Sequence, residues 1–439
     1  MTRKIGIIGG GQLGLMIAEE AHRQGAAVYA LDPSPDAPAF AECDGHIVAA
    51  YNDLDALEKL GDMTDVLTYE FENVPGDILR HLEGKYNIPQ GIAPLFDSQD
   101  RLREKNNAKR HGLPVPEYIP LPACSSDEDC AEVPCQLADA QRIEELTAAV
   151  KKIGMPCVLK TRRLGYDGHG QAVIKSENDI AAAADMLRVP CILEAFIQFD
   201  YECSVILVRD GKDTVHFPIG RNIHKGGILD LCIVPAGTLY ETACGKKPAE
   251  NQLCSRIVNA CEHFMEGCDY RGILAIELFV KGNDFIFNEM APRPHNSGHY
   301  TIEGCTSSQY TELCHFLLGK ALQKPELVAP TVMKNILGQD LEAAWKIIDT
   351  AHAEHWQNPA SVPVSNSAKR EKAYCGEAGR GVFVHIYGKT ESRPKRKMAH
   401  ITFVSMTLAE YEKDWADKFV KYKNKYTDGK LPDFCRKVS

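Results

Sequence analysis

Short apolar runs and amphipathic segments alternate along the start of the chain, and this alternation limits the fold more than any other feature. The apolar runs lie at Lys4–Gly10, Ala26–Asp32, His46–Ala50 and Asp65–Glu72. Helical patterns separate some of them, at Leu13–Gly25 and Asp53–Gly61. Strands that alternate with helices predict a parallel α/β sheet, so we expect such a domain over residues 1–97.

The rest of the chain divides into a larger mixed unit and a smaller one. A polar helix is expected at Asp97–Gly112, and helices then mix with short strands up to about residue 330, which predicts an α+β unit with antiparallel sheets. Residues 123–141 are rich in Ser, Asp, Glu, Cys and Ala and indicate a surface insertion. Strand patterns near residues 381–389 and 400–405 predict a small β-rich domain over residues 331–439.

The composition excludes several classes of protein. The formal net charge of -10 at pH 7 gives no general attraction to nucleic acid or to anionic membranes. No apolar run is long enough to span a bilayer, and the apolar start of the chain breaks at once into glycines, unlike a secretory signal. The 16 cysteines contain no CxxC pair and are typical of buried thiols in a reducing compartment. We therefore expect a cytoplasmic protein without nucleic-acid or membrane partners.

A first glycine motif, Gly9-x-Gly11-x-x-Gly14, follows a predicted strand and opens a predicted helix, and Asp32 ends the next strand. This context matches a dinucleotide-binding fingerprint. The same geometry also presents backbone N–H groups to any phosphate or polar ligand at a helix N-terminus. Asp32 lies in a proline-rich stretch that fits a turn equally well. An NAD-dependent oxidoreductase is therefore one of the alternatives at this point.

A second glycine segment, KTRRLGYDGHGQ, spans Lys160–Gln171. Its glycines allow backbone N–H groups to close around phosphate oxygens, and Lys160 at the end of a strand supplies positive charge. The segment lacks the Walker sequence, and an ordinary hairpin loop is the alternative. Three glycines beside Arg162, Arg163 and Asp167 favour phosphate binding over a plain hairpin.

Two carboxylates indicate a metal site. Glu277 lies within an apolar strand and Glu289 at the end of the next, with a short turn between them. Adjacent antiparallel strands can place both on one face beside Asn288, and such oxygens suit Mg²⁺ that bridges ATP phosphates. An ion pair with Arg293 is the alternative partner for a buried carboxylate. We favour the metal because two carboxylates and an amide converge.

Polar side chains crowd the segment that follows Glu289: Arg293, His295, Asn296, Ser297 and His299. Such a composition directly after a buried strand is typical of a site, which we expect to face an acceptor substrate. A basic run, KTESRPKRK at Lys389–Lys397, reads either as a solvated face or as a loop that holds a phosphate.

These segments, in this order, resemble the ATP-grasp superfamily and, within it, the N5-carboxyaminoimidazole ribonucleotide synthetases of purine biosynthesis. The motifs that carry the resemblance are GYDGHGQ, NEMAPRPHNSGH and RPKRKMAH, and it covers nearly the whole chain. It implies an ATP-grasp domain over residues 98–330 with a mobile lid at about 119–197, a Rossmann-like pre-ATP-grasp domain before it, and a C-terminal domain with a substrate-phosphate loop after it. It also implies a homodimeric ligase that uses ATP, with Mg²⁺ or Mn²⁺, to carboxylate 5-aminoimidazole ribonucleotide with bicarbonate by way of carboxyphosphate.

The resemblance also implies the residues of the site. Those that contact ATP would be Arg101, Lys160, Gly165, Tyr166, Asp167, Gly168, His169, Gly170, Gln171, Glu194, Ala195, Phe196, Ile197, Glu202, His224, Asn288 and Glu289. The metal ligands would be Glu277 and Glu289. The ribonucleotide would contact Tyr166, Asp167, His169 and Asn296, with its phosphate on Lys389, Arg396 and Lys397 and its ribose near Gln12, Leu13 and either Glu70 or Glu72. Arg293 would hold bicarbonate, and His295 or Asp167 would move the proton.

The chain departs from the family pattern at three places. His169 stands where the family usually has Arg or Lys, Ala399 replaces a usual Gly, and the insertion at 123–141 has no family counterpart.

The alternative functions fit the sequence less well. A related formate-dependent glycinamide ribonucleotide transformylase usually carries Ser-Ser-Gly-Lys-Gly-Gln in place of GYDGHGQ. An NAD enzyme leaves Lys160, Glu277 and Glu289 unexplained. A non-catalytic nucleotide-binding protein is disfavoured by the intact metal ligands.

Overall fold

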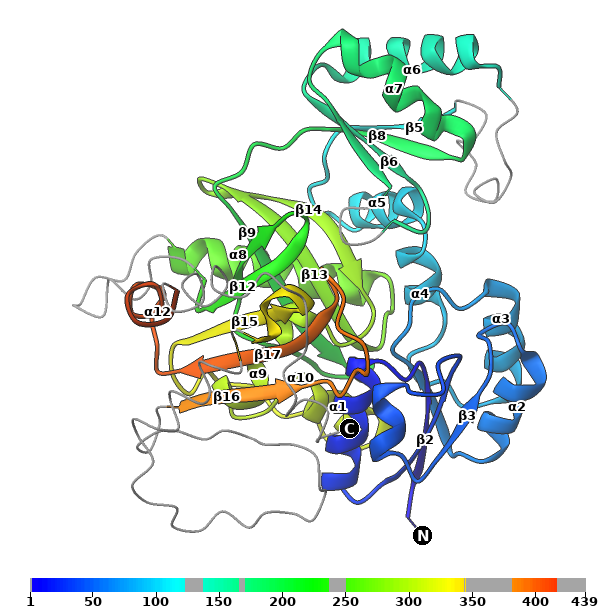
Figure 1. Ribbon diagram of the computed structural model, residues 1–439, viewed down its shortest axis with the longest axis vertical. Helices are drawn as coiled ribbons and strands as arrows, with labels where there is room; N and C mark the ends of the chain where they lie inside the picture. Colours follow the sequence, from blue (N-terminus) through cyan, green and yellow to red (C-terminus); the bar gives the residue numbers. More distant parts are fainter. Residues whose placement is uncertain are drawn as a thin grey trace.

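The computed structural model describes residues 2–122, 137–165, 170–236, 250–342, 344 and 381–416. These residues form three β-sheets, one parallel with four strands, one antiparallel with four strands and one with nine. In Figure 1 the large sheet lies in the middle, the N-terminal sheet at the lower right and the smaller antiparallel sheet at the top. The large sheet therefore lies between the other two sheets in this view.

The N-terminal sheet has the order β3-β2-β1-β4, and all its pairings are parallel. Its strands are β1 Lys4–Ile8, β2 Ala27–Asp32, β3 Gly45–Val48 and β4 Val66–Tyr69. Its helices are α1 Gln12–Arg23, α2 Leu54–Asp62 and α3 Gly76–Lys85. Strand β1 is one of the two inner strands and is buried along Ile5–Ile8, as a strand covered on both faces should be. The predicted parallel α/β sheet is confirmed.

The single polar helix expected at Asp97–Gly112 is wrong in detail, because the structure has two helices there. Helix α4 spans Ala93–Ser98 and helix α5 spans Arg101–Arg110. Asp100 separates them as the N-cap of α5, where its Oδ1 accepts a hydrogen bond from the Leu102 N–H at 2.9 Å. An Asp in this position ends one helix and starts the next.

The small antiparallel sheet, which we call the lid sheet, has the order β5-β8-β6-β7. Its strands are β5 Tyr118–Leu121, β6 Cys157–Thr161, β7 Gln171–Ile174 and β8 Cys191–Ala195. Helices α6 Asp139–Ile153 and α7 Ile180–Ala183 pack on it around an apolar core that includes Leu146 and Leu159. Strands β6 and β7 form the predicted glycine hairpin, with Lys160 opposite Gln171.

The large sheet has the order β14-β13-β9-β11-β12-β15-β17-β16, with β10 paired to β9. Its strands are β9 Tyr201–Arg209, β10 Thr214–His216, β11 Gly220–Lys225, β12 Ile228–Val234, β13 Gly272–Lys281, β14 Asp284–Ala291, β15 Thr331–Leu337, β16 Gly381–Ile386 and β17 Lys397–Val404. All its pairings are antiparallel. The strands predicted for the C-terminal unit therefore continue the sheet of the middle unit, through the pairing of β12 with β15.

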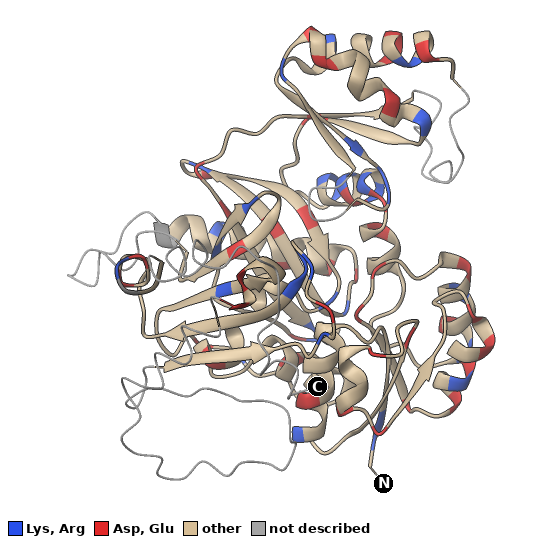
Figure 2. Ribbon diagram, in the orientation of Figure 1, with Lys and Arg blue, Asp and Glu red and all other residues tan. Residues whose placement is uncertain are grey.

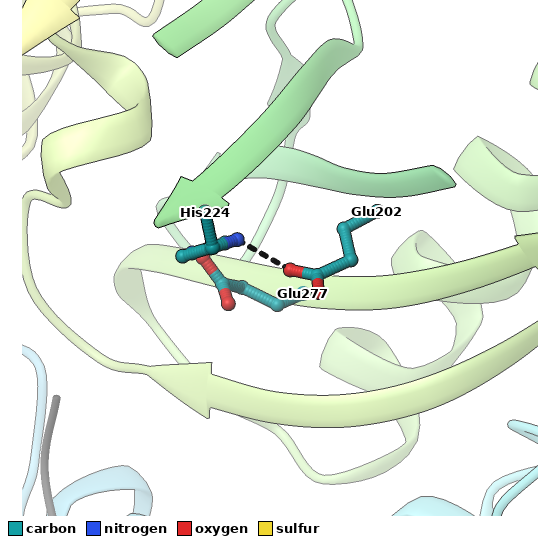
Figure 3. A group of neighbouring side chains, drawn as sticks. All are labelled: Glu202, His224 and Glu277. Carbon is teal, nitrogen blue, oxygen red and sulfur yellow. Dashed lines mark ion pairs between the residues drawn. The ribbon is translucent and has the colours of Figure 1, made fainter. Parts of the chain in front are cut away.

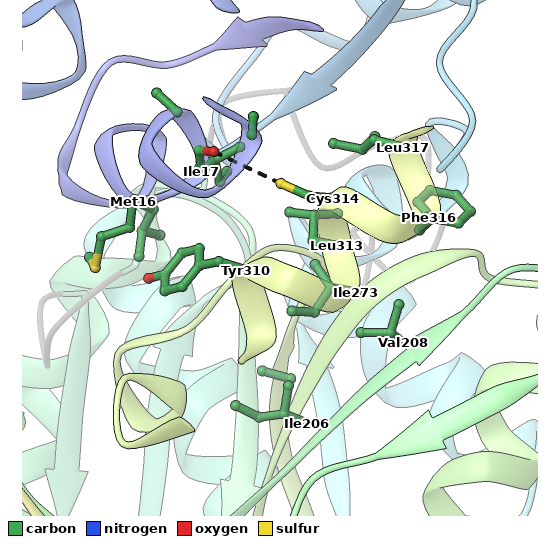
Figure 4. Close-up of a cluster of buried hydrophobic side chains, with 14 of the residues drawn as sticks. Met16, Ile17, Ile206, Val208, Ile273, Tyr310, Leu313, Cys314, Phe316 and Leu317 are labelled. Carbon is green, nitrogen blue, oxygen red and sulfur yellow. Dashed lines mark hydrogen bonds between the residues drawn. The ribbon is translucent and has the colours of Figure 1, made fainter. Parts of the chain in front are cut away.

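Helix α10, Gln309–Leu318, joins the N-terminal sheet to the large one. Figure 4 shows it between Met16 and Ile17 of α1 and a group of apolar side chains on β9 and β13. Cys314 lies in this contact, with its Sγ 3.9 Å from the Ile17 carbonyl oxygen. This apolar layer fixes how the first glycine turn faces the large sheet.

The remaining helices are α8 Glu250–Gly267, α9 Thr301–Gly304 and α12 Leu408–Tyr411. Helix α8 carries Cys254 and Cys261, and Cys268 follows its last residue. Cys261 is fully buried, and Cys254 and Cys268 are half-buried against the same core. Along the part of the chain with described structure, no helix combines the length and the apolar character that crossing a membrane requires.

Candidate active site

A cavity of about 390 Å³ is lined by residues of the lid sheet and the large sheet, and by Glu72 and Asn73, which follow β4 of the N-terminal sheet. Every residue predicted to contact ATP that the structure describes, except Gly170, lines it: Arg101, Lys160, Gly165, Gln171, Glu194, Ala195, Phe196, Ile197, Glu202, His224, Asn288 and Glu289. Glu277, Arg293, His295, Asn296 and Lys397 line it as well. Tyr166, Asp167, Gly168 and His169 lie outside the described residues, as does most of the insertion at 123–141.

The nucleotide end of the cavity contains a buried carboxylate between two lysines. Lys160 Nζ donates a hydrogen bond to Glu194 Oε2 at 2.9 Å, and Lys105 Nζ lies 3.5 Å from Glu194 Oε1. Burial alone would raise the pKa of Glu194, but the two lysines hold it down, at about 2. The same burial lowers the pKa of Lys160, and the charge of Glu194 opposes that change. Glu194 is therefore ionised at neutral pH, and Lys160 is the basic group that it faces at this end.

The two predicted metal ligands face each other across a strand pair. Glu277 on β13 is the register partner of Glu289 on β14, and the register shifts directly after this pair. Asn288 is therefore an extra residue in β14, a bulge of the kind that re-aims side chains beside active sites. Burial, and then the charge of Glu289, raise the pKa of Glu277 to about 8. Arg101, whose Nη1 lies 3.4 Å from Glu289 Oε2, helps to hold the pKa of Glu289 below its usual value against the opposing effect of burial.

Glu277 also belongs to a group that could hold a cation. Figure 3 shows Glu202, His224 and Glu277 pointing toward one another from three neighbouring strands. Their ligand atoms all lie within 4.8 Å of one another, and His224 Nδ1 is 2.5 Å from Glu202 Oε2. Burial would lower the pKa of His224, but the hydrogen bond to Glu202 and the charge of Glu277 raise it. These three side chains therefore form a compact group that could offer ligand atoms to a cation.

The segment after Glu289 forms the other end of the cavity. Arg293 Nε lies 2.9 Å from Glu72 Oε1, so a carboxylate from the N-terminal unit orients the guanidinium. His295 Nδ1 is 2.8 Å from Ser297 Oγ and 3.7 Å from Glu277 Oε1. Burial and the positive charges of Arg293 and Lys397 keep the pKa of His295 well below its usual value. This imidazole is therefore neutral at pH 7.

Not all of that segment faces the cavity, and here the sequence interpretation is wrong. Ser297 and His299 are fully buried and do not line the cavity. His299 Nδ1 lies 3.0 Å from the Tyr310 hydroxyl, and its ring stacks on His400 at 4.5 Å between centroids. A polar cluster in the sequence looked like one surface, but the short helix at Asn296–Gly298 turns part of it into the core.

The basic loop lies against the first glycine turn. Lys389 Nζ donates hydrogen bonds to Gln12 Oε1 at 2.6 Å and to the Lys397 carbonyl oxygen at 2.7 Å. Burial and the neighbouring charges of Arg396 and Lys397 lower the pKa of Lys389 to about 8. The residues predicted for the substrate phosphate thus lie beside Gln12, which was predicted to lie near its ribose.

In the first glycine turn, carboxylates of the protein bind the N–H groups that a dinucleotide would need. The Gly10 N–H donates to Asp32 Oδ2 at 2.8 Å, and the Gly11 N–H donates to Glu70 Oε1 at 2.6 Å. Asp32 also accepts hydrogen bonds from Ser34 N–H and from the Tyr51 hydroxyl. A pyrophosphate would have to displace both acidic side chains from these N–H groups, which argues against NAD at this turn.

Sequence reasoning missed three charged residues of helix α5 and its N-cap. Glu104 and Lys105 are almost fully buried beside the cavity, although a polar helix gives no sign of which charges are buried. Asp100 binds Arg162, whose Nε and Nη2 lie 3.0 and 2.7 Å from its two oxygens. Arg162 therefore anchors the cap of α5, and its place beside the glycine hairpin needs no phosphate to explain it.

Comparison with known proteins agrees with this geometry. Residues 1–94 match the ribonucleotide synthetase preATP-grasp domain, residues 107–310 the ATP-grasp domain, and residues 331–414 the phosphoribosylaminoimidazole carboxylase C-terminal domain. The N5-carboxyaminoimidazole ribonucleotide synthase of Staphylococcus haemolyticus is 35% identical over 421 residues, 94% of this chain and 96% of that protein. The chain belongs to the N5-carboxyaminoimidazole ribonucleotide synthase family.

Solved structures of this ATP-grasp ligase family share the fold over nearly the whole chain. An ADP complex of an N5-carboxyaminoimidazole ribonucleotide synthetase aligns with a TM-score of 0.79 at 33% identity, over 96% of this chain and 98% of that one. The Staphylococcus aureus enzyme complexed with ADP aligns at 0.77 with 32% identity, over 95% and 98%. These matches confirm the predicted ATP-grasp fold with its pre-ATP-grasp and C-terminal parts.

Proposed function

We propose that this chain is an ATP-dependent ligase that carboxylates the exocyclic amine of 5-aminoimidazole ribonucleotide with bicarbonate, giving N5-carboxyaminoimidazole ribonucleotide, ADP and phosphate. One observation carries the proposal. A single cavity joins a nucleotide end, which includes Lys160 and Arg101, to an acceptor end formed by Arg293, His295 and Lys397. An ATP-dependent transfer to a phosphorylated acceptor needs both ends in one site.

ATP would bind between the lid sheet and the large sheet. Lys160 and Arg101 are the cations that reach this part of the cavity, and the half-exposed Phe196 offers an apolar surface to the base. Glu194, kept ionised by its lysines, is suited to accept hydrogen bonds from the adenine amino group or the ribose. Gly165, at one described end of the glycine hairpin, lines the same cavity, and the backbone N–H groups of a glycine-rich segment suit phosphate oxygens.

Mg²⁺, with Mn²⁺ as an alternative, would be held by Glu277 and Glu289. The residues fit such an ion, because Glu277 Oε1 is buried without a hydrogen-bond partner among the described atoms and faces the carboxylates of Glu289 and Glu202. When bound, the ion would neutralise charge on the ATP phosphates.

The protein would bring bicarbonate to the γ-phosphate from the acceptor end. A bicarbonate oxygen attacks the phosphorus, the bond to ADP breaks and carboxyphosphate forms. The amine of the ribonucleotide then attacks the carboxyl carbon, directly or as released CO₂, and phosphate leaves. Arg293, oriented by Glu72, would hold the bicarbonate. The neutral His295, or alternatively Asp167, would accept the proton that the amine loses.

Release of phosphate from ATP tests the proposal. We expect turnover to require bicarbonate and 5-aminoimidazole ribonucleotide together. Phosphate release stimulated instead by glycinamide ribonucleotide and formate would overturn the substrate assignment. His295→Asn and Asp167→Asn then separate the two candidate bases, because only the base should lose turnover while ATP affinity is kept. That the protein acts in the cytoplasm as a homodimer is a further prediction, and sedimentation of the purified protein checks the dimer.

A further inference from the structure

Strand β14 is the edge strand of the large sheet, and it carries one of the two candidate metal ligands. Within the part of the chain that the structure describes, no strand pairs with its outer side. The bulge at Asn288 interrupts the regular pairing with β13 on its inner side. A bulged edge strand is free to twist and shift unless other groups bind its exposed N–H and C=O groups. A metal ligand on such a strand stays in place only if residues outside the sheet hold the strand's backbone.

Helix α5 supplies that support with buried charges on one face. Lys105 Nζ donates a hydrogen bond to the Asn288 carbonyl oxygen at 2.5 Å. The Met290 N–H donates to Glu104 Oε1 at 2.6 Å. These are the backbone groups on either side of Glu289. In Figure 2, Lys and Arg residues crowd on α5 next to the junction with the lid sheet.

A third residue of the same helix face reaches the side chain between them. Arg101 Nη1 lies 3.4 Å from Glu289 Oε2, and residues 101, 104 and 105 share one face because helix positions i, i+3 and i+4 are neighbours. Just beyond α5, the Pro114 carbonyl oxygen accepts the Phe287 N–H at 2.7 Å. Each residue from Phe287 to Met290 is thus held from outside the sheet.

Burial shows that these charges are placed for a specific contact. Glu104 is 2% exposed and Lys105 is 0% exposed, and an apolar side chain would fill either place at lower desolvation cost. Lys105 also lies 5.2 Å from the Phe287 ring centroid and 3.5 Å from Glu194 Oε1. Lys105 therefore links Glu194 on the lid sheet to the backbone of β14, the strand that carries Glu289.

We infer that Glu104 and Lys105 are positioning residues that hold the bulged segment of β14, so that Glu289 faces Glu277 and the nucleotide. We call this arrangement the α5 clamp. The inference rests on the proposed nucleotide- and metal-dependent function. Neither residue needs to touch substrate or metal. Their effect should appear in how strongly the metal strengthens nucleotide binding.

The test measures ADP affinity by calorimetry with excess Mg²⁺ and again with EDTA, for the wild-type protein and four variants. The dissociation constant measured with EDTA, divided by the one measured with Mg²⁺, reports how much the metal strengthens nucleotide binding. Lys105→Met removes the donor and keeps the length of the side chain. Glu104→Leu removes the acceptor, whereas Glu104→Gln keeps an oxygen that can accept the Met290 N–H. Lys109→Met is the matched control, one turn along α5 and exposed.

The expected result is that Lys105→Met and Glu104→Leu lower the ratio by about tenfold, the effect of losing one charge-assisted hydrogen bond. Glu104→Gln and Lys109→Met should keep the wild-type ratio. Folded Lys105→Met and Glu104→Leu proteins with wild-type ratios would overturn the α5 clamp. If Lys105→Met does not fold, the comparison of Glu104→Leu with Glu104→Gln decides alone. A wild-type protein that binds no ADP would instead overturn the proposed function.

Discussion

The molecule contains two glycine turns that look alike in sequence and differ in what surrounds them. In the first, the N–H groups of Gly10 and Gly11 bind the carboxylates of Asp32 and Glu70. In the second, the described ends of the hairpin lie beside Lys160 and Arg101, and Arg101 Nη2 donates to the Gly165 carbonyl oxygen at 3.3 Å. Glycine spacing therefore marks where another group approaches the backbone closely. The charges of the neighbouring side chains decide whether that group is an anionic ligand or a carboxylate of the protein itself.

The largest expected effect comes from removing the cation of the second turn. Lys160→Met should lower kcat/KM for ATP by about three orders of magnitude, because a buried positive charge that faces the transferred phosphate is lost. Phosphate release measures this. Lys175→Met is the matched control, because Lys175 is exposed just past the end of the same hairpin. Equal losses in both variants would contradict the role given to Lys160.

In the first turn, Gly9→Ala should destabilise the protein by about 3 kcal/mol. Gly9 has φ +111, and a Cβ there would lie 2.7 Å from Glu70 Oε1. Denaturant unfolding measures the loss. Gly25→Ala separates the two causes, because Gly25 has φ +84 but nothing within 4 Å of an added Cβ. If both variants lose the same stability, contact with Glu70 does not explain the glycine.

Glu70 should also make stability depend on pH near neutrality. Burial raises its pKa to about 7, although the Gly11 N–H opposes the change. The folded state then binds a proton that the unfolded state has already released, so stability falls as pH rises from about 5 to 8. Relative to Glu70→Gln, the wild type should lose about 2 kcal/mol over this range. Unfolding curves of both proteins at several pH values check this, and parallel pH profiles would refute it.

The smallest expected effect is a coupling between Gly11 and Glu70. Gly11 has an ordinary φ of -70, and an added Cβ would lie 2.9 Å from Glu70 Oε1. Gly11→Ala should cost about 1 kcal/mol in the wild type and nothing in a Glu70→Ala background. A double-mutant cycle on unfolding free energies measures the coupling. A coupling of zero would mean that Glu70 does not determine the residue at position 11.

Local patterns let the sequence predict part of this site. Glu277 and Glu289 could be paired in advance because a short turn joins their strands. The approach of Glu202 and His224 could not be derived that way, because it depends on the register of β9, β11 and β13, which are distant in sequence. That expectation came from the family resemblance alone.

The sequence also could not predict which charged side chains are buried. Lys105 looks like any lysine on a polar helix, and its burial appears only when β14 and β8 are placed around it. Arg162 looked like part of a phosphate loop until its pairing with Asp100 was visible. The first glycine turn had the right fingerprint for a dinucleotide, but the sequence did not show that Glu70 would bind its N–H groups.

The central claim is that the γ-phosphate of ATP passes to bicarbonate in the cavity beneath the second glycine turn. Bicarbonate labelled with ¹⁸O tests it directly, because the oxygen that attacks phosphorus stays on the phosphate when the carboxyl group is transferred. The account predicts one labelled oxygen in each phosphate released with 5-aminoimidazole ribonucleotide present. Phosphate that carries no label from bicarbonate, and takes its new oxygen from water, would contradict it.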